Sequence, residues 1–175
     1  MSATSGNSRR KTLLAGAIGT VAVIVGGAAW WTLGRREPAP ALKYTLLGGR
    51  QGELGALRGK VVLVNFWATS CSACVKEMPA LVDTDTKFRA RGYETLAVAM
   101  SYDPPAYVSR FVESRKLPFL VSIDGGGVWA RAFGDVRMTP TTFLLDKRGR
   151  IVKRYLGEPD FKALHALIEK LLTEG

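Results

Sequence analysis

The chain has 175 residues, which suits one globular domain with a hydrophobic core and leaves little room for two. Its formal net charge is +10, but five of the 25 basic residues precede residue 37, where there is no acidic residue. The other 20 basic and 15 acidic residues are scattered and lack the interleaved aromatic residues of a nucleic-acid surface. We therefore expect a basic protein with no nucleic-acid partner.

The first 41 residues are expected to attach the domain to a membrane. Residues 1–11 form a polar tail that ends in three basic residues, and residues 12–33 carry no charge over 22 positions, which is long enough for one transmembrane helix. Residues 34–41, which include the sequence EPAPA, are predicted to be a linker. The positive tail favours a cytoplasmic N-terminus. Residues 42–175 are then a periplasmic domain, held to the bacterial inner membrane by a single pass.

A cleaved signal peptide is the alternative interpretation of this segment. The small residues Gly27, Ala28 and Ala29 stand at a spacing typical of signal-peptide cleavage. The apolar run is longer than a usual signal core and continues through Trp30 and Trp31, whose rings favour the membrane interface. We therefore prefer a retained anchor, although both interpretations export the domain.

The exported part alternates between predicted strands and helices. The segment 60–67 is a nearly continuous apolar run rich in valine, which is typical of a strand buried on both faces of a sheet. Segments 141–146 and 151–155 flank a Lys-Arg-Gly turn and are predicted to form a hairpin. This order indicates an α/β fold, with a mixed sheet and helices on both faces. The other predicted elements are helices at 72–90, 104–116, 128–133 and 159–172, and strands at 93–100 and 119–123.

Both cysteines of the chain, Cys71 and Cys74, directly follow the apolar run. A disulfide between them closes so small a ring that it would stabilise the fold little. A zinc site needs four ligands, and beyond this pair the chain has no further cysteine and only one histidine, His165. We therefore expect no metal site and interpret the two cysteines as reagents.

The helix predicted at 72–90 indicates how the two cysteines divide the chemistry. Cys71 stands at its N-terminus, where unpaired N–H groups and the helix dipole stabilise a thiolate, so Cys71 is the expected nucleophile. Cys74 lies one turn further on the same side and can attack a mixed disulfide, which releases the partner protein. The pair is thus predicted to act as a redox-active disulfide with no bound cofactor.

The segment NFWATSCSACVKEMP, in which a Cys-x-x-Cys pair follows a buried strand and precedes Pro79, resembles the active site of thioredoxin-fold proteins. Together with the later segment Met138-Thr139-Pro140, it resembles more narrowly the membrane-anchored TlpA/ResA-like thiol-disulfide oxidoreductases. The resemblance covers roughly residues 42–172. It implies a thioredoxin-like fold, in which a mixed central sheet is flanked by helices and carries a central insert.

The resemblance also implies where a substrate binds. Pro140 is expected to be cis, which would place the Thr139 backbone beside the Cys71 sulfur, where it can pair with an extended substrate. Trp67 is expected to pack beneath the site, and we group it with Thr139 and Pro140 as substrate-binding. An ordinary trans-proline at the start of a strand is the alternative for Pro140.

Glu77 matches an acidic position that the ResA-like proteins place near the cysteine pair. A buried carboxyl group there would have a raised pKa and could exchange a proton with Cys74 as its thiolate forms. A solvated glutamate that complements the helix dipole is the alternative. The choice matters because Asn65 occupies the position where thioredoxins usually carry a buried aspartate, and an amide cannot shuttle a proton.

The resemblance implies a reductase for the disulfides of exported proteins, supplied with electrons by a membrane thiol carrier of the DsbD or CcdA kind. Apocytochrome c and the copper-site cysteines of a respiratory oxidase are the expected clients. Ser70 and the pair Ser72-Ala73 depart from the common motif, so the redox potential of the family does not transfer. The alternatives are an oxidant that introduces disulfides, a copper(I)-binding chaperone with the two cysteines as soft ligands and, more remotely, a peroxidase.

Overall fold

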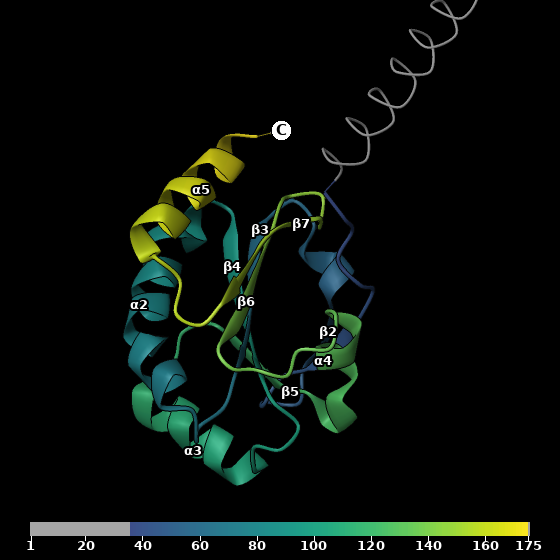
Figure 1. Ribbon diagram of the computed structural model, residues 1–175, viewed down its shortest axis with the longest axis vertical. Coiled ribbons are helices and arrows are strands. Elements are labelled where there is room, and N and C mark those ends of the chain that lie inside the picture. Colours follow the sequence, from purple (N-terminus) through teal and green to yellow (C-terminus); the bar gives the residue numbers. More distant parts are fainter. Residues whose placement is uncertain (1–35, 175) are drawn as a thin grey trace, which may run out of the picture. The chain divides into compact units, whose positions relative to one another are not determined.

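The computed structural model describes residues 36–174 of the chain (Figure 1). The predicted tail at 1–11 and the predicted membrane span at 12–33 lie outside the described residues. Within residues 36–174, no helix combines the length and the apolar character that crossing a membrane requires. One compact unit of the chain begins at Glu37, earlier than the start at residue 42 that the sequence predicts.

A five-stranded mixed sheet forms the centre of the domain, with the strand order β5-β4-β3-β6-β7. Its parallel half joins β3 to β4 and β4 to β5, and its antiparallel half joins β3 to β6 and β6 to β7. The apolar run predicted from the sequence is therefore the central strand, β3. The strands are β3 (Val61–Trp67), β4 (Tyr93–Ala99), β5 (Leu120–Ile123), β6 (Thr141–Leu145) and β7 (Ile151–Leu156).

Helices cover both faces of this sheet, as the alternation of elements predicts (Figure 1). One face carries α2 (Ser72–Phe88), α3 (Pro105–Arg115) and α5 (Phe161–Thr173). The other face carries α4 (Val128–Ala132), the 3-10 turn η1 (Leu54–Leu57) and a small hairpin of β1 (Lys43–Thr45) and β2 (Gln51–Glu53). Two further 3-10 turns, η2 (Arg89–Arg91) and η3 (Gly125–Gly127), follow α2 and β5.

Successive side chains of β3 point to opposite faces of the sheet, so the strand contributes to two hydrophobic cores. Leu63 and Trp67 belong to the core under α2, α3 and α5, and Val64 and Phe66 belong to the core under α4. All seven residues of β3 are buried, which explains why the strand reads as an almost continuous apolar run. Asn65 is the polar exception, and it shares the face of Leu63 and Trp67.

The small hairpin and the start of the domain differ from the sequence prediction. The strands β1 and β2 have three residues each, with Tyr44 the one buried side chain, and this is too little for a periodic signal. The end of the predicted linker is not a free spacer, because Ala39 N donates to Gly149 O at 2.9 Å and Ile151 N donates to Glu37 O at 2.7 Å. The entry of the chain into the domain, at residues 37–39, is thus hydrogen-bonded to the turn between β6 and β7 and the start of β7.

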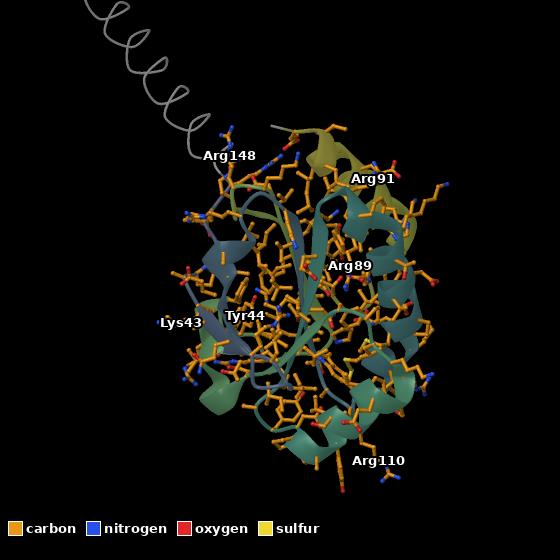
Figure 2. All side chains as sticks on the ribbon, turned by 180° about the vertical axis from the view of Figure 1, so that it is seen from behind. Lys43, Tyr44, Arg89, Arg91, Arg110 and Arg148 are labelled. Carbon is orange, nitrogen blue, oxygen red and sulfur yellow. A yellow bond between two sulfur atoms is a disulfide. The ribbon has the colours of Figure 1, made fainter. Side chains whose placement is uncertain are left out.

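The two ends of the sheet carry different features. The turn between β6 and β7 lies at the end where β3 begins, because β6 runs antiparallel to β3. The opposite end carries the C-terminal ends of β3 and β4 and the start of β6, where Phe66 pairs with Thr141. In Figure 2, Arg148 in the β6–β7 turn and Arg110 on α3 mark these two ends. The cysteine pair lies at the end marked by Arg110, far from the entry of the chain.

Candidate active site

The two cysteines lie where the central strand passes into α2. Cys71 is the N-cap residue of α2, and its sulfur accepts a hydrogen bond from Cys74 N at 3.1 Å. The two residues form a disulfide, with their Cα atoms 5.2 Å apart. Cys71 is partly exposed, whereas Cys74 is fully buried. Of the two sulfurs, that of Cys71 is therefore the one that a molecule from outside can reach.

The N-terminus of α2 can also stabilise Cys71 in the reduced state. Once the disulfide is reduced, the Cys74 N–H group and the other unpaired N–H groups in the first turn of α2 can stabilise a thiolate on Cys71. The sequence places no acidic residue in this first turn to oppose that charge. The local structure thus favours Cys71 as the thiolate and leaves Cys74 as the thiol that must lose its proton inside the protein.

Asp103 holds the loop in front of the reactive cysteine. This residue follows β4, is 3% exposed, and accepts hydrogen bonds from both the backbone N and the Oγ1 of Thr69 at 2.6 Å. Sequence analysis missed Asp103, because a carboxylate before two prolines shows no recognisable pattern. The contact exists only because the parallel pairing of β3 and β4 brings the two loops together.

The loop before β6 completes the edge of the site. The Thr139–Pro140 peptide bond is cis, as the resemblance implies, with Pro140 buried and Thr139 half-buried. Two hydrogen bonds hold this loop, from Gly157 N to Pro140 O at 2.8 Å and from Thr141 Oγ1 to Met138 O at 2.7 Å. The loop lies at the same end of the sheet as the cysteines, because β6 starts beside the end of β3.

Exposed apolar side chains gather at this end of the domain. Tyr102 is 59% exposed, Met138 is 67% exposed, and the Tyr102 hydroxyl lies 3.5 Å from Thr139 Oγ1. Tyr107 and Arg110 line a shallow surface depression that also includes Thr69. Tyr102 and Met138 are not among the predicted site residues. They place apolar surface on the rim of the site, next to the residues predicted to bind substrate.

Trp67 does not offer a surface to a substrate. Its side chain is fully buried, and its ring centroid lies 5.2 Å from that of Phe111 on α3. The expectation that it packs beneath the site is thus confirmed, but its place among substrate-binding residues is corrected. The reason is its position at the last residue of β3, on the face that α3 covers.

A buried polar cluster lies behind the disulfide. Glu77, one turn after Cys74 on α2, is fully buried, and its Oε1 accepts a hydrogen bond from Asn65 Nδ2 at 3.0 Å. The same Nδ2 atom donates to Thr142 Oγ1 at 2.9 Å, and Thr142 faces Asn65 across the β3–β6 pair. The alternative of a solvated Glu77 is therefore excluded. Sequence analysis missed Thr142, which reaches the cluster only through strand register.

Burial in this apolar surrounding raises the pKa of Glu77 from 4.5 to about 7. The hydrogen bond from Asn65 acts in the opposite direction, since it stabilises the carboxylate, and the negative charge of Glu158 raises the pKa further. At neutral pH the carboxyl group is thus present in both protonation states. It can accept a proton or release one, which is what a general acid or base at this position requires.

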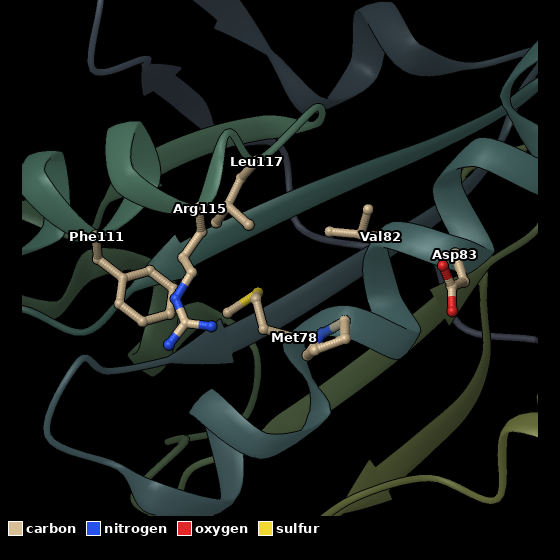
Figure 3. A pocket seen from close by; sticks show the side chains of 7 residues that line it. Met78, Val82, Asp83, Phe111, Arg115 and Leu117 are labelled. Atoms are coloured by element: carbon tan, nitrogen blue, oxygen red, sulfur yellow. The ribbon is translucent and has the colours of Figure 1, made fainter.

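A groove between α2 and α3 adjoins this region without containing either cysteine. It has a volume of about 240 Å³, and Figure 3 shows Met78 and Val82 of α2 on one side with Phe111 of α3 on the other. The Arg115 guanidinium lies over the Phe111 ring, 5.6 Å from its centroid. Its remaining lining residues are Pro79, Asp83 and Leu117.

His165 takes no part in the cluster. Its Nε2 lies 2.8 Å from Thr84 Oγ1, and its ring packs edge-on against Phe88. Both of these residues lie about two turns or more after Glu77 along α2. Among residues 36–174, no group of three or more His, Cys, Asp or Glu side chains is arranged to hold a metal ion.

A reactive disulfide at the N-terminus of a helix, on a sheet with this strand order and beside a cis-proline loop, defines a thioredoxin-fold thiol-disulfide oxidoreductase. The comparisons with known proteins agree. The family model described as Redoxin matches residues 35–168. The chain belongs to this family, and within it to the TlpA/ResA-like thiol-disulfide oxidoreductases.

The relatives named thiol-disulfide oxidoreductase ResA are similar over most of their length. The protein from Bacillus thuringiensis subsp. konkukian is 35% identical over 135 residues, which are 77% of each chain. The protein from Halalkalibacterium halodurans is 39% identical over 142 residues, or 80% of each chain. Among solved structures, the thioredoxin domain of a thiol-disulfide oxidoreductase from Bacteroides vulgatus superposes with a TM-score of 0.69 at 27% identity. That match covers 78% of this chain and 96% of the other.

Proposed function

We propose that the protein works as a reductase that keeps selected cysteines of exported proteins reduced. The observation that carries this direction is the fully buried Glu77 one turn after Cys74. A carboxylate close to the pair opposes the stabilisation that the start of α2 gives to a Cys71 thiolate, so the surroundings stabilise the reduced form less than the helix alone would. Strong oxidants of this fold owe their potential to the opposite, a stabilised reduced form. The protein therefore gives up its electrons readily.

In the proposed reaction the Cys71 thiolate attacks one sulfur of a client disulfide, forms a mixed disulfide and releases the first client thiolate. Cys74 then gives its proton to the Glu77 carboxylate, and its sulfur attacks Cys71 Sγ. The internal disulfide forms and the second client thiolate leaves, so that two electrons have passed from the protein to the client. Because Cys74 is fully buried, an acceptor inside the protein is needed for its proton.

The client is proposed to bind as an extended segment along the cis-proline loop. The backbone of Thr139 would pair with the segment next to its cysteine, in the manner of strand addition. The exposed side chains of Tyr102 and Met138 would supply apolar contacts next to that backbone. Apocytochrome c and the copper-site cysteines of a respiratory oxidase are the client classes that we propose.

We further propose that residues 12–33 anchor the protein in the bacterial inner membrane with the domain in the periplasm. The apolar run in the sequence supports this, as does the position of the chain entry at the end of the sheet opposite to the cysteines. A tether at that end would leave the disulfide accessible. A membrane thiol carrier of the DsbD or CcdA kind would return the electrons, and tethering would raise its effective concentration.

The experiment that tests the direction is the reduction potential of the full chain in detergent, measured by equilibration with defined dithiol and glutathione buffers. We expect a value near or below about −230 mV, which places the protein with the reductants. A value above about −150 mV would make it an oxidant that introduces disulfides, and the proposal would be wrong. The variant Cys74→Ser serves as the control that cannot close the internal disulfide.

A further inference from the structure

Two oxygen atoms in the buried cluster lack a partner among the described residues. These are Asn65 Oδ1 and Glu77 Oε2, both without accessible surface and without a hydrogen bond. Buried polar atoms are nearly always paired, so such atoms call for an explanation in the chemistry of the site. Here they belong to two side chains that already bond to each other. The two unpaired oxygens therefore have to be explained together, from the way in which Asn65 and Glu77 bind each other.

The amide of Asn65 is oriented with its donor side toward its neighbours. Nδ2 donates to Glu77 Oε1 at 3.0 Å and to Thr142 Oγ1 at 2.9 Å, which uses both amide protons. This orientation suits an ionised Glu77, because a carboxylate only accepts hydrogen bonds. It does not suit a protonated Glu77 whose O–H group needs an acceptor, and the free acceptor, Oδ1, lies on the far side of the amide.

A rotation of the amide about its last side-chain bond exchanges these two sides. After rotation, Oδ1 faces Glu77 and Thr142, and it can accept from the carboxylic acid and from the threonine hydroxyl together. The hydroxyl can follow, because a threonine hydroxyl donates as readily as it accepts. The backbone can stay in place, since Asn65 and Thr142 are paired residues of β3 and β6 in the middle of the sheet.

We propose that Asn65 is a positioning residue whose amide binds Glu77 in both protonation states, donating to the carboxylate and, after rotation together with the Thr142 hydroxyl, accepting from the acid. When Glu77 takes a proton from Cys74, the new O–H group can then donate to Asn65 Oδ1. When the proton leaves Glu77, the amide rotates back and Nδ2 again donates to the carboxylate. This inference rests on the proposed role of Glu77 as the proton partner. It explains why an amide, which cannot itself carry the proton, occupies the centre of the sheet.

The other charged groups near Glu77 do not offer an alternative partner. Glu158, in the segment between β7 and α5, acts on Glu77 through its charge and bonds Lys76 Nζ at 2.8 Å on the surface. From the sheet, the groups that reach Glu77 are the neutral Asn65 and, behind it, Thr142. From α2 itself come the cysteines, which are joined in the oxidised protein and do not titrate. In the oxidised protein, the titration of Glu77 can therefore be measured without an overlapping titration of the cysteines.

The chain offers a direct test, because its only asparagines are Asn7 and Asn65. Full-length oxidised protein in detergent micelles, labelled with ¹⁵N in asparagine and ¹³C in glutamate, gives two asparagine side-chain amide signals in NMR spectra. We expect the Asn65 amide signals to shift with the same midpoint as the Glu77 carboxyl carbon. We also expect the contact between the Asn65 amide protons and the Thr142 methyl group to weaken below that midpoint. Asn7 is the internal control and should not follow.

Variants add a second test with the same readout. In Asn65→Leu the carboxylate loses its donor, and because hydrogen bonds to charged groups are the stronger ones, the pKa of Glu77 should rise by at least one unit, a tenfold change in its ionisation constant. Asn65→Asp keeps the volume, and the two carboxyls should then titrate in two separated steps. The control is Thr84→Val, which removes a buried threonine hydroxyl of α2 that bonds Ala80 O and His165, and it should leave the pKa unchanged.

Asn65 signals that stay constant through the titration of Glu77 would overturn the proposal, and so would an unchanged Glu77 pKa in Asn65→Leu. The wild-type titration decides the question even if both variants fail to fold. The proton role of Glu77 is tested separately by the pH profile of disulfide reduction in Glu77→Gln. A pH profile in Glu77→Gln that is unchanged from that of the wild type, together with a titrating Asn65, would remove the proposed proton transfer and leave the amide partnership standing.

Discussion

The substitution Glu77→Gln should remove the part of the pH dependence of the unfolding free energy that comes from protonation of Glu77. Burial raises the pKa of Glu77 from 4.5 to about 7, so the folded protein holds a proton that the unfolded chain has released. The free energy of unfolding of the wild type should therefore fall as the pH rises from about 4.5 to about 7, and stay level above. Glutamine has the same shape and cannot ionise, so this fall should disappear.

The size of the effect follows from the shift. One pKa unit corresponds to about 1.36 kcal/mol, so the ionised Glu77 lowers the stability of the fold by about 3 kcal/mol above pH 7. Near pH 4 the carboxyl group is neutral in both states and the two proteins should differ only by a constant. The difference in unfolding free energy, variant minus wild type, should thus grow by about 3 kcal/mol between pH 4 and pH 8.

The assay is urea unfolding of the oxidised full-length protein in a non-ionic detergent, followed by fluorescence at intervals between pH 4 and pH 8.5. The matched control is Asp135→Asn, which removes a carboxylate that is paired with Arg137 on the surface and does not act on Glu77. Such an exposed pair contributes at most about 1 kcal/mol. Parallel pH curves for the wild type and Glu77→Gln would refute the reasoning, since they would mean that Glu77 ionises as easily in the fold as in the unfolded chain.

Three further results are expected. In the reduced protein, iodoacetamide should modify Cys71 faster than Cys74, and faster modification of Cys74 in the single Cys→Ser variants would contradict the assigned order of reaction. Asp103→Asn keeps the shape of the side chain but weakens its hydrogen bonds to Thr69 in the loop before Cys71. The second-order rate of client reduction should therefore fall at least several-fold, with little loss of stability. Tyr102→Ala removes exposed apolar surface on the rim, so KM for a protein client should rise while reduction of a small disulfide stays unchanged; equal effects on both substrates would argue against client contact.

Much of the fold follows from local patterns in the sequence. The valine-rich run of β3 predicts a strand buried on both sides, because a central strand of a covered sheet exposes neither face. The ends of α2, at Ser72 and Phe88, lie within two residues of the prediction, and the two cysteines stand at the predicted helix start. By contrast, the hairpin of β1 and β2 was not predicted, because strands of three residues carry no periodicity.

The chemistry of the site divides in the same way. The order Cys71, Cys74, Glu77 along one helix can be read from the sequence, since spacing alone sets which side chains share a helix face. The contact of Asp103 with Thr69 and that of Asn65 with Thr142 cannot be read from the sequence, because each joins two residues that are far apart in the chain and that only the pairing of strands brings together.

Burial also needed the tertiary structure. The sequence leaves open whether Glu77 is solvated, and Trp67 was placed among the substrate contacts although α3 covers it. Covalent neighbours and helix periodicity thus determine which residues carry the reaction. Strand register and packing determine which groups surround them, and because desolvation and hydrogen bonding are set by those surroundings, only the tertiary structure decides the pKa of Glu77 and its partnership with Asn65.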